Sequence, residues 1–256
     1  MRAAVLGLLL LPCLAGAVAA AEPPARTEPA DRCPAPAALV TPARPLDRLA
    51  ASIRAGGPVR ILTVGSGSTT GQDDSGAAAY PQRMQEALRR DLRVPVSLTI
   101  KGARGMTATE MLRLIEAALS AQRFALVIWQ TGTVEAIAGT PPAALQATLR
   151  EGAAKVDAAG ADLVLVGPLY SRPLLERARL EPYVAALAGT ADAPGRALFD
   201  RLTLTRGWAA EGRIDLEHAA TREERQAALE RLHACVGEAL ARFVASGASA
   251  ASATGR

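Results

Sequence analysis

The chain has 256 residues, with 29 Lys and Arg against 25 Asp and Glu, and a formal net charge of +4. Aromatic residues make up only 3% of it. Because the basic residues do not gather in runs and few rings are available for base stacking, we expect no nucleic-acid binding. The length suits one domain with a sizeable core.

The first residues have the pattern of a secretory signal peptide over 1–21: a cationic start, an apolar run from Val5 to Leu11 and small residues before the cleavage site. We therefore expect an exported, periplasmic or secreted protein without stable membrane insertion after cleavage, since the run is too short to span a bilayer. Residues 22–45 form a Pro/Ala-rich leader and 246–256 an Ala/Ser/Gly-rich tail. Neither has apolar periodicity, so we predict a folded domain over 46–245 and a disordered tail.

Two cysteines remain after the predicted cleavage, Cys33 in the leader and Cys235 near the end of the chain. An oxidising compartment would allow them to pair, and Cys33 has no packing reason to lie in a polar leader. We predict a disulfide between them. Two unpaired thiols, one of them in the core, are the alternative.

Strand-like and helix-like patterns alternate along the domain. A β-rich run at 59–64 precedes a helical pattern at 80–92, and a strand at 96–100 precedes a helix at 107–119 that opens with the capping box of Thr107 and Glu110. The remaining predicted elements are a buried strand at 125–131, a helix from 141 to 160, a strand at 162–166, a largely helical stretch at 174–187, a short strand at 197–199 and a long helix at 221–244.

This alternation predicts an α/β fold: a three-layer α/β/α sandwich with a doubly wound parallel sheet. Ligands bind such sheets at the carboxyl ends of the strands. The loops that follow Val64, Ile100, Thr131 and Val166 are therefore the candidates for a functional site.

The loop after the first strand, residues 65–71, is rich in Gly, Ser and Thr. A phosphate-binding P-loop needs Lys after its last Gly, where this chain has Gln72 followed by two aspartates. The dinucleotide fingerprint fails as well, because Thr70 stands where its third Gly is required. We therefore expect no nucleotide at this loop, and no cofactor.

Four segments, in order, resemble the conserved blocks of the SGNH/GDSL hydrolase family. They are the strand and turn at 61–69, the segment 101–108 with Gly102 and Gly105, the strand and turn at 126–135, and Asp215-Leu216-Glu217-His218 before the last helix. The resemblance covers roughly residues 58–245 and implies the family's three-layer sandwich. It also implies acyl or acetyl ester hydrolysis, with a small ester or an envelope glycan or lipid as the substrate.

The family uses a Ser nucleophile, a His base oriented by Asp, and an oxyanion hole that includes a Gly N–H and an Asn side chain. Residue by residue, the resemblance puts Gly67 at the nucleophile, Gly105 at the oxyanion Gly and Val134 at the Asn. Asp215 and His218 match the acid and the base.

Three interpretations of the turn stay open. Ser66 or Ser68 has replaced the nucleophile from an adjacent position; or the site is inactive and binds a ligand through the hydroxyls of Ser66, Ser68, Thr69 and Thr133; or the serines only satisfy backbone groups of the turn. The first yields an ester hydrolase. The second yields an inactive SGNH-fold protein that binds an envelope glycan, lipid or peptide.

Other residues could contribute to such a site. We expect His218 rather than His233 to be the base, because His233 lies within the apolar stripe of the last helix. Gln130, Thr133, Glu135 and Arg104 are candidate substrate-binding residues, with Gln130 able to replace the missing Asn as a donor. The two histidines and the cysteines do not have metal-ligand spacing, so no metal site is predicted.

Overall fold

The computed structural model describes residues 33–71, 79–214 and 216–254, and Cys33 begins its compact unit. The predicted signal peptide and Asp215 lie outside the described residues. Within them, no helix is both long and apolar enough to cross a membrane.

Five parallel strands form one sheet in the order β2-β1-β3-β4-β5. The strands are β1 (Val59–Gly65), β2 (Val96–Gly102), β3 (Leu126–Gln130), β4 (Asp162–Val166) and β5 (Arg196–Phe199). From β1 the chain first moves to β2 on one side of it and then to β3 on its other side. The direction in which the sheet is built therefore reverses after β2. This reversal is where open α/β sheets place their ligand crevice.

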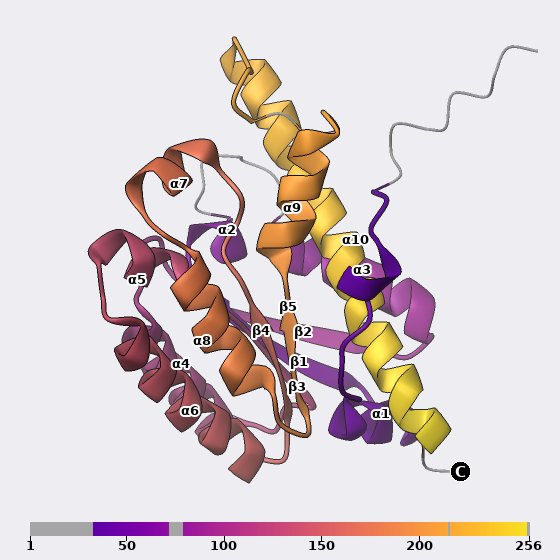
Figure 1. Cartoon of the computed structure of the whole chain (residues 1–256). Coiled ribbons are helices and arrows are strands. Elements are labelled where there is room, and N and C mark those ends of the chain that lie inside the picture. Colours follow the sequence, from indigo (N-terminus) through magenta and orange to yellow (C-terminus); the bar gives the residue numbers. More distant parts are fainter. Residues whose placement is uncertain (1–32, 72–78, 215, 255–256) are drawn as a thin grey trace, which may run out of the picture. The chain divides into compact units, whose positions relative to one another are not determined.

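Helices cover both faces of the sheet, as Figure 1 shows, and the predicted three-layer fold is confirmed. One layer consists of α1 (Asp47–Arg54), α3 (Tyr80–Leu92) and α10 (Arg222–Thr254), and the opposite layer of α4 (Ala108–Ala121), α6 (Pro142–Ala158) and α8 (Glu181–Ala191). Short helices lie in the connections: the 3-10 helix η1 (Ala37–Leu39), α2 (Gly67–Thr70), α5 (Thr133–Ala138), α7 (Arg172–Arg177) and α9 (Arg201–Ala210).

Successive side chains of each strand alternate between two cores. On β3, Leu126 and Ile128 pack with α3 and α10, whereas Val127 and Trp129 pack with α4 and α6. All five residues of β3 are buried, as expected for a central strand of a parallel sheet covered on both faces. The carboxyl end of this rigid strand is Gln130.

The two ends of the domain differ from the sequence prediction. The predicted disordered tail is wrong over 246–254, because α10 continues to Thr254 and buries Ala248 and Ala251. Small residues allow the chain at the end of the leader to approach α10 closely. The Leu46 N–H donates to the carbonyl of Gly247, and a Cβ at Gly247 would lie 2.8 Å from Leu46 Cγ. The Ala/Ser/Gly composition is therefore a packing feature.

A disulfide joins Cys33 to Cys235 across 202 residues and confirms the predicted pairing. Further contacts hold the same leader segment on the domain: Trp208 Nε1 donates to the carbonyl of Pro34 and Arg242 Nη2 to the carbonyl of Cys33. Residues 33–45 thus belong to the folded unit, although the sequence prediction placed them outside the folded domain.

Candidate functional site

The turn after β1 lies against the end of β2. Gly65 pairs with Gly102, whose φ is +134°, and a Cβ on Gly102 would be 1.8 Å from the carbonyl oxygen of Gly65. Side chains at these two positions would separate the strand ends. The glycines therefore bring the Ser66 turn next to the loop that carries Gly105.

Ser66 makes two hydrogen bonds in this turn. Its Oγ accepts from the Gly105 N–H at 3.0 Å, and its own N–H donates to Gln130 Oε1 at 3.1 Å. Gly105 has φ of +77°, the left-handed conformation in which glycine is favoured, and this directs its N–H to the serine. The N–H that the family resemblance assigns to an oxyanion hole is therefore occupied by the Ser66 hydroxyl.

Gln130 connects this turn to the interior. Its Oε1 also accepts from Thr69 Oγ1 at 3.1 Å, and Thr69 Oγ1 lies 3.0 Å from the hydroxyl of Tyr80. Both Gln130 and Thr69 are buried. Both partners of Oε1 are donors, so the carbonyl end of the Gln130 amide faces the turn. Its two hydrogen bonds hold the turn in place.

Ser68 has a different partner. Its Oγ accepts from Arg201 Nη1 at 3.2 Å, and Arg201 Nε donates to the carbonyl of Gly167. Arg201 is only 2% exposed, and its guanidinium lies 5.8 Å from the ring centre of Tyr80. Burial raises the pKa of the Tyr80 hydroxyl, which Arg201 and Thr69 partly oppose, so Tyr80 stays neutral at ordinary pH.

Glu135 is buried and ties two loops together. One carboxylate oxygen accepts from the Ala108 N–H, and the other accepts from Gly132 N–H at 3.0 Å and from Thr131 Oγ1 at 3.3 Å. Both oxygens are therefore engaged within the protein. The structure gives this predicted substrate-binding residue a role in joining the start of α4 to the turn after β3.

The two histidines occupy different environments. His233 is 3% exposed on α10, and its Nδ1 accepts from the Tyr80 N–H at 3.2 Å. A nitrogen that already accepts a hydrogen bond cannot also take a proton from a nucleophile. His218 is exposed on the loop before α10. In the described part of the chain, neither histidine forms a hydrogen bond with Ser66 or Ser68.

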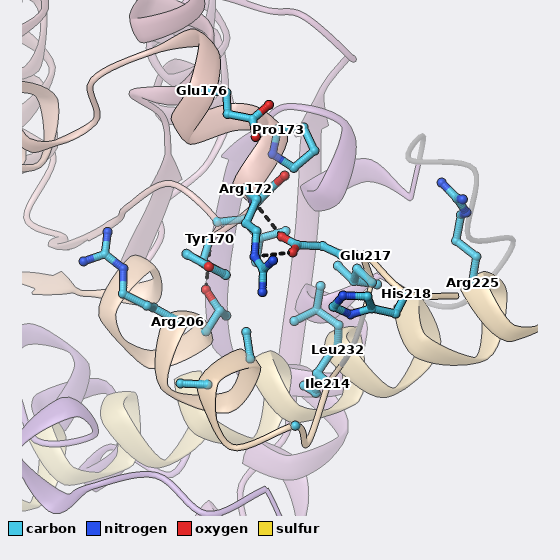
Figure 2. A pocket seen from close by; sticks show the side chains of 17 residues that line it. Tyr170, Arg172, Pro173, Glu176, Arg206, Ile214, Glu217, His218, Arg225 and Leu232 are labelled. Atoms are coloured by element: carbon cyan, nitrogen blue, oxygen red, sulfur yellow. Dashed lines mark hydrogen bonds and ion pairs between the residues drawn. The ribbon is translucent and has the colours of Figure 1, made fainter. Parts of the chain in front are cut away.

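His218 lines a cavity of about 780 Å³ between the loop after β4 and the segment that joins α9 to α10. Figure 2 shows Ile214 and Leu232 on one side of it, with Arg206 and Arg225 far apart at its edges. Arg172 and Glu217 form an ion pair at 2.8 Å, and the Arg172 N–H donates to the same carboxylate at 2.7 Å. Neither Ser66 nor Ser68 is among the lining residues.

The remaining predicted residues lie around the same edge of the sheet. Gly67 is the buried first residue of α2, Thr133 begins α5, and Val134 follows it half-buried with no polar atom in its side chain. Arg104 is exposed beside Gly105. Within residues 33–71, 79–214 and 216–254, no group of three or more His, Cys, Asp or Glu side chains could hold a metal ion.

Sequence reasoning missed two sets of residues. The first is the buried set of Tyr80 and Arg201, which hold Thr69 and Ser68; a helical tyrosine and an arginine after a short strand give no local signal of their contact. The second set lines the cavity and includes Tyr170, Arg172 and Arg206. The sequence signal for this second set was that residues 169–173 follow shortly after strand β4, at the carboxyl end of the sheet.

A five-stranded parallel sheet with helices on both faces is the fold of SGNH hydrolase-like α/β proteins, and this chain has that fold. A model of the non-GDSL lipase-like family matches residues 32–250, and the chain belongs to that family. No curated protein is similar enough in sequence to match.

Solved structures agree on the fold. TesA is 22% identical with a TM-score of 0.53, over 71% of this chain and 97% of its own. AlinE4, an SGNH-hydrolase family esterase, is 19% identical with a TM-score of 0.52, over 66% and 89%. A variant of Axe2, the acetyl-xylooligosaccharide esterase from Geobacillus Stearmophilus, is 16% identical with a TM-score of 0.55, over 74% and 95%. At these identities the likeness defines the fold alone.

Proposed function

We propose that this chain is an exported relative of the SGNH/GDSL ester hydrolases whose catalytic blocks are degenerate, and that it binds an envelope glycan, lipid or peptide without cleaving it. Export is supported by the signal-like start of the sequence and agrees with the disulfide between Cys33 and Cys235. The similar esterases support the origin of the fold, not an activity of this chain.

The observation that carries the proposal is that the turn after β1 has no side chain at the nucleophile position and that its serine hydroxyls are already hydrogen-bonded. Gly67, at the position that the family resemblance assigns to the nucleophile, has no side chain, and the flanking hydroxyls of Ser66 and Ser68 are held by Gly105 and Arg201. Val134 has no donor for an oxyanion. Loss of one such donor lowers the rate of an acyl transfer about a hundredfold or more, and loss of the nucleophile is more severe.

A displaced serine nucleophile is the second candidate, and one observation favours it. Ser66 Oγ lies 3.0 Å from the Gly105 nitrogen, so this hydroxyl stands beside a donor that could stabilise an oxyanion. However, an acyl oxygen would need the N–H that Ser66 itself occupies. Attack by Ser66 would therefore require the turn to rearrange, which its bond to Gln130 opposes.

Hydrolysis of short-chain p-nitrophenyl esters separates the two functions. For a binding protein, we expect the purified domain to hydrolyse no faster than matched variants with Ser66→Ala or Ser68→Ala. A rate that falls at least tenfold in only one of these variants, while both remain folded, would establish a displaced nucleophile and contradict the proposal.

A further inference from the structure

The cavity beside His218 combines an apolar floor with cationic edges. Ile214 and Leu232 are both less than 10% exposed and form part of the floor, together with Ala209 at the end of α9. Arg206 and Arg225 stand at opposite edges in Figure 2. A ligand that fills this space meets hydrocarbon at the centre and guanidinium groups at the margin.

The charges at the edges do not cancel among the described lining residues. Three arginines and two glutamates line the cavity, but Glu217 is already bound to Arg172. Glu176 is the other carboxylate. In the described part of the chain, Arg206 and Arg225 take part in no ion pair, and Arg206 instead lies 5.8 Å from the ring centre of Tyr170. The unpaired charge at the margin is therefore positive.

The walls are fixed by contacts that a ligand does not have to supply. The Tyr170 N–H donates to Thr205 Oγ1 at 3.0 Å and holds the loop after β4 against α9. On the other side, Glu217 accepts from the backbone and side chain of Arg172 and joins α7 to the His218 loop. Ligand pockets are commonly pre-formed in this manner, with mainly apolar walls and a few placed polar groups.

We propose that this cavity binds an anionic amphiphile, a molecule with one carboxylate or phosphate group on an apolar body of about eight carbons. The apolar body lies on the floor of Ile214 and Leu232, and the acid group is bound by Arg225 or Arg206. Arginine suits both acids because its planar donors match two acceptor oxygens. This inference rests on the binding part of the proposed function and assigns it a site and a ligand class.

Calorimetric titration of the full domain with octyl phosphate, octanoate and octanol tests the proposal. We expect at least one of the two acids to bind at least tenfold more tightly than octanol. Raising the salt concentration from 50 to 500 mM should weaken the acid but not octanol, since salt screens exposed charges. Binding of either acid with this preference supports the site, and the tighter acid identifies the head group.

Variants locate the site. Removal of the arginine that binds the acid group, by Arg225→Ala or by Arg206→Ala, should weaken the acid about threefold to fivefold, the range for an exposed charge contact, and the other variant should have little effect. Arg222→Ala is the matched control, because Arg222 is an exposed arginine of α10 that does not line the cavity. Ala210→Phe adds a ring at an exposed lining position and should weaken all three ligands by filling the space.

The inference is overturned if neither acid binds, if octanol binds as tightly as the acids, if neither Arg225→Ala nor Arg206→Ala weakens the acid more than Arg222→Ala does, or if Ala210→Phe has no effect. Different results would contradict this inference and the proposed function. Ester hydrolysis dependent on a serine would contradict the proposed function whatever octyl phosphate does, whereas a failed titration of an inert domain would overturn this site alone.

Discussion

Gln130 determines how the turn after β1 is held. Its Oε1 accepts from the Ser66 N–H, which is partly buried, and from the buried Thr69 Oγ1. The sequence indicated Gln130 as a possible donor in place of the family's Asn. In the structure its carbonyl oxygen acts as an acceptor, a difference that no local pattern reveals because it depends on which atoms the folded turn presents.

Gln130→Met tests this role, since it keeps the side-chain length but removes the oxygen that accepts both hydrogen bonds. We expect the free energy of unfolding to fall by about 1 to 3 kcal/mol, because the buried Thr69 hydroxyl and the partly buried Ser66 N–H lose their acceptor. Gln130→Glu keeps acceptor oxygens but buries a carboxylate, so it should lose at least as much. Urea unfolding measures both variants, and a Met variant as stable as the wild type would show that Gln130 does not hold the turn.

Asp162, at the amino end of β4, titrates unusually. Burial raises the pKa of its carboxyl to about 6, although the Leu49 N–H bonded to Oδ2 and the guanidinium of Arg48, 3.6 Å from Oδ1, oppose the shift. Because the folded-state pKa is above the unfolded one, the stability that protonated Asp162 contributes is present below about pH 4 and is lost as pH rises through about 6.

The Asp162→Asn variant removes this titration. Between pH 5 and pH 7.5, we expect the stability of the variant relative to the wild type to rise by about 1.4 kcal/mol, roughly half of the full effect of a shift of about two units. Unfolding in urea at the two pH values measures the difference. An equal difference at both values, or one of opposite sign, would contradict the raised pKa.

At the scale of elements, the apolar strands and the long periodic helices were predictable and the short helices were not. The helix at 107–119 was predicted from its capping box and apolar spacing, and α4 has both Thr107–Glu110 bonds of that box. In contrast, α9 was missed because Leu and Thr alternate in its sequence, although Asp200 caps it by accepting from the Thr203 N–H. The four-residue α2 is too short for a periodic signal.

The leader and α10 form one cross-linked unit, so the disulfide should contribute to stability. In the chain-entropy model, a loop of 202 residues contributes at most about 5 kcal/mol. We expect the double variant Cys33→Ser and Cys235→Ser to unfold at a lower urea concentration, with a loss of about 2 to 5 kcal/mol. Mass analysis without reductant should find no free thiol at either position in the wild type, and two free thiols would contradict the pairing.

At the scale of the whole molecule, strand and helix alternation was sufficient to predict the fold and the edge of the sheet that carries the site. It was not sufficient to predict the arrangement within that edge. His218 lies on a cavity formed by the loop after β4, α7, α9 and the start of α10, whereas Ser66 belongs to the turn beside Gly105. Such relations depend on how loops from distant parts of the chain pack together, which spacing along the sequence does not encode.

Restoring the missing groups tests whether the rest of the family site is intact. Gly67→Ser with Val134→Asn supplies a nucleophile at the start of α2 and a donor in α5. If Asp215 and His218 still act as acid and base, we expect hydrolysis of p-nitrophenyl acetate in the double variant and at least tenfold less in either single variant. A folded double variant that stays inert would contradict that role for Asp215 and His218.

The most direct test of the central claim is intact-mass analysis of the mature domain after treatment with a fluorophosphonate, which labels activated serines. An active serine esterase of similar size, labelled in parallel, establishes that the reagent works. We predict no adduct on the folded wild-type domain. A stoichiometric adduct that disappears with Ser66→Ala or with Ser68→Ala would contradict the account and establish this chain as a serine hydrolase with a displaced nucleophile.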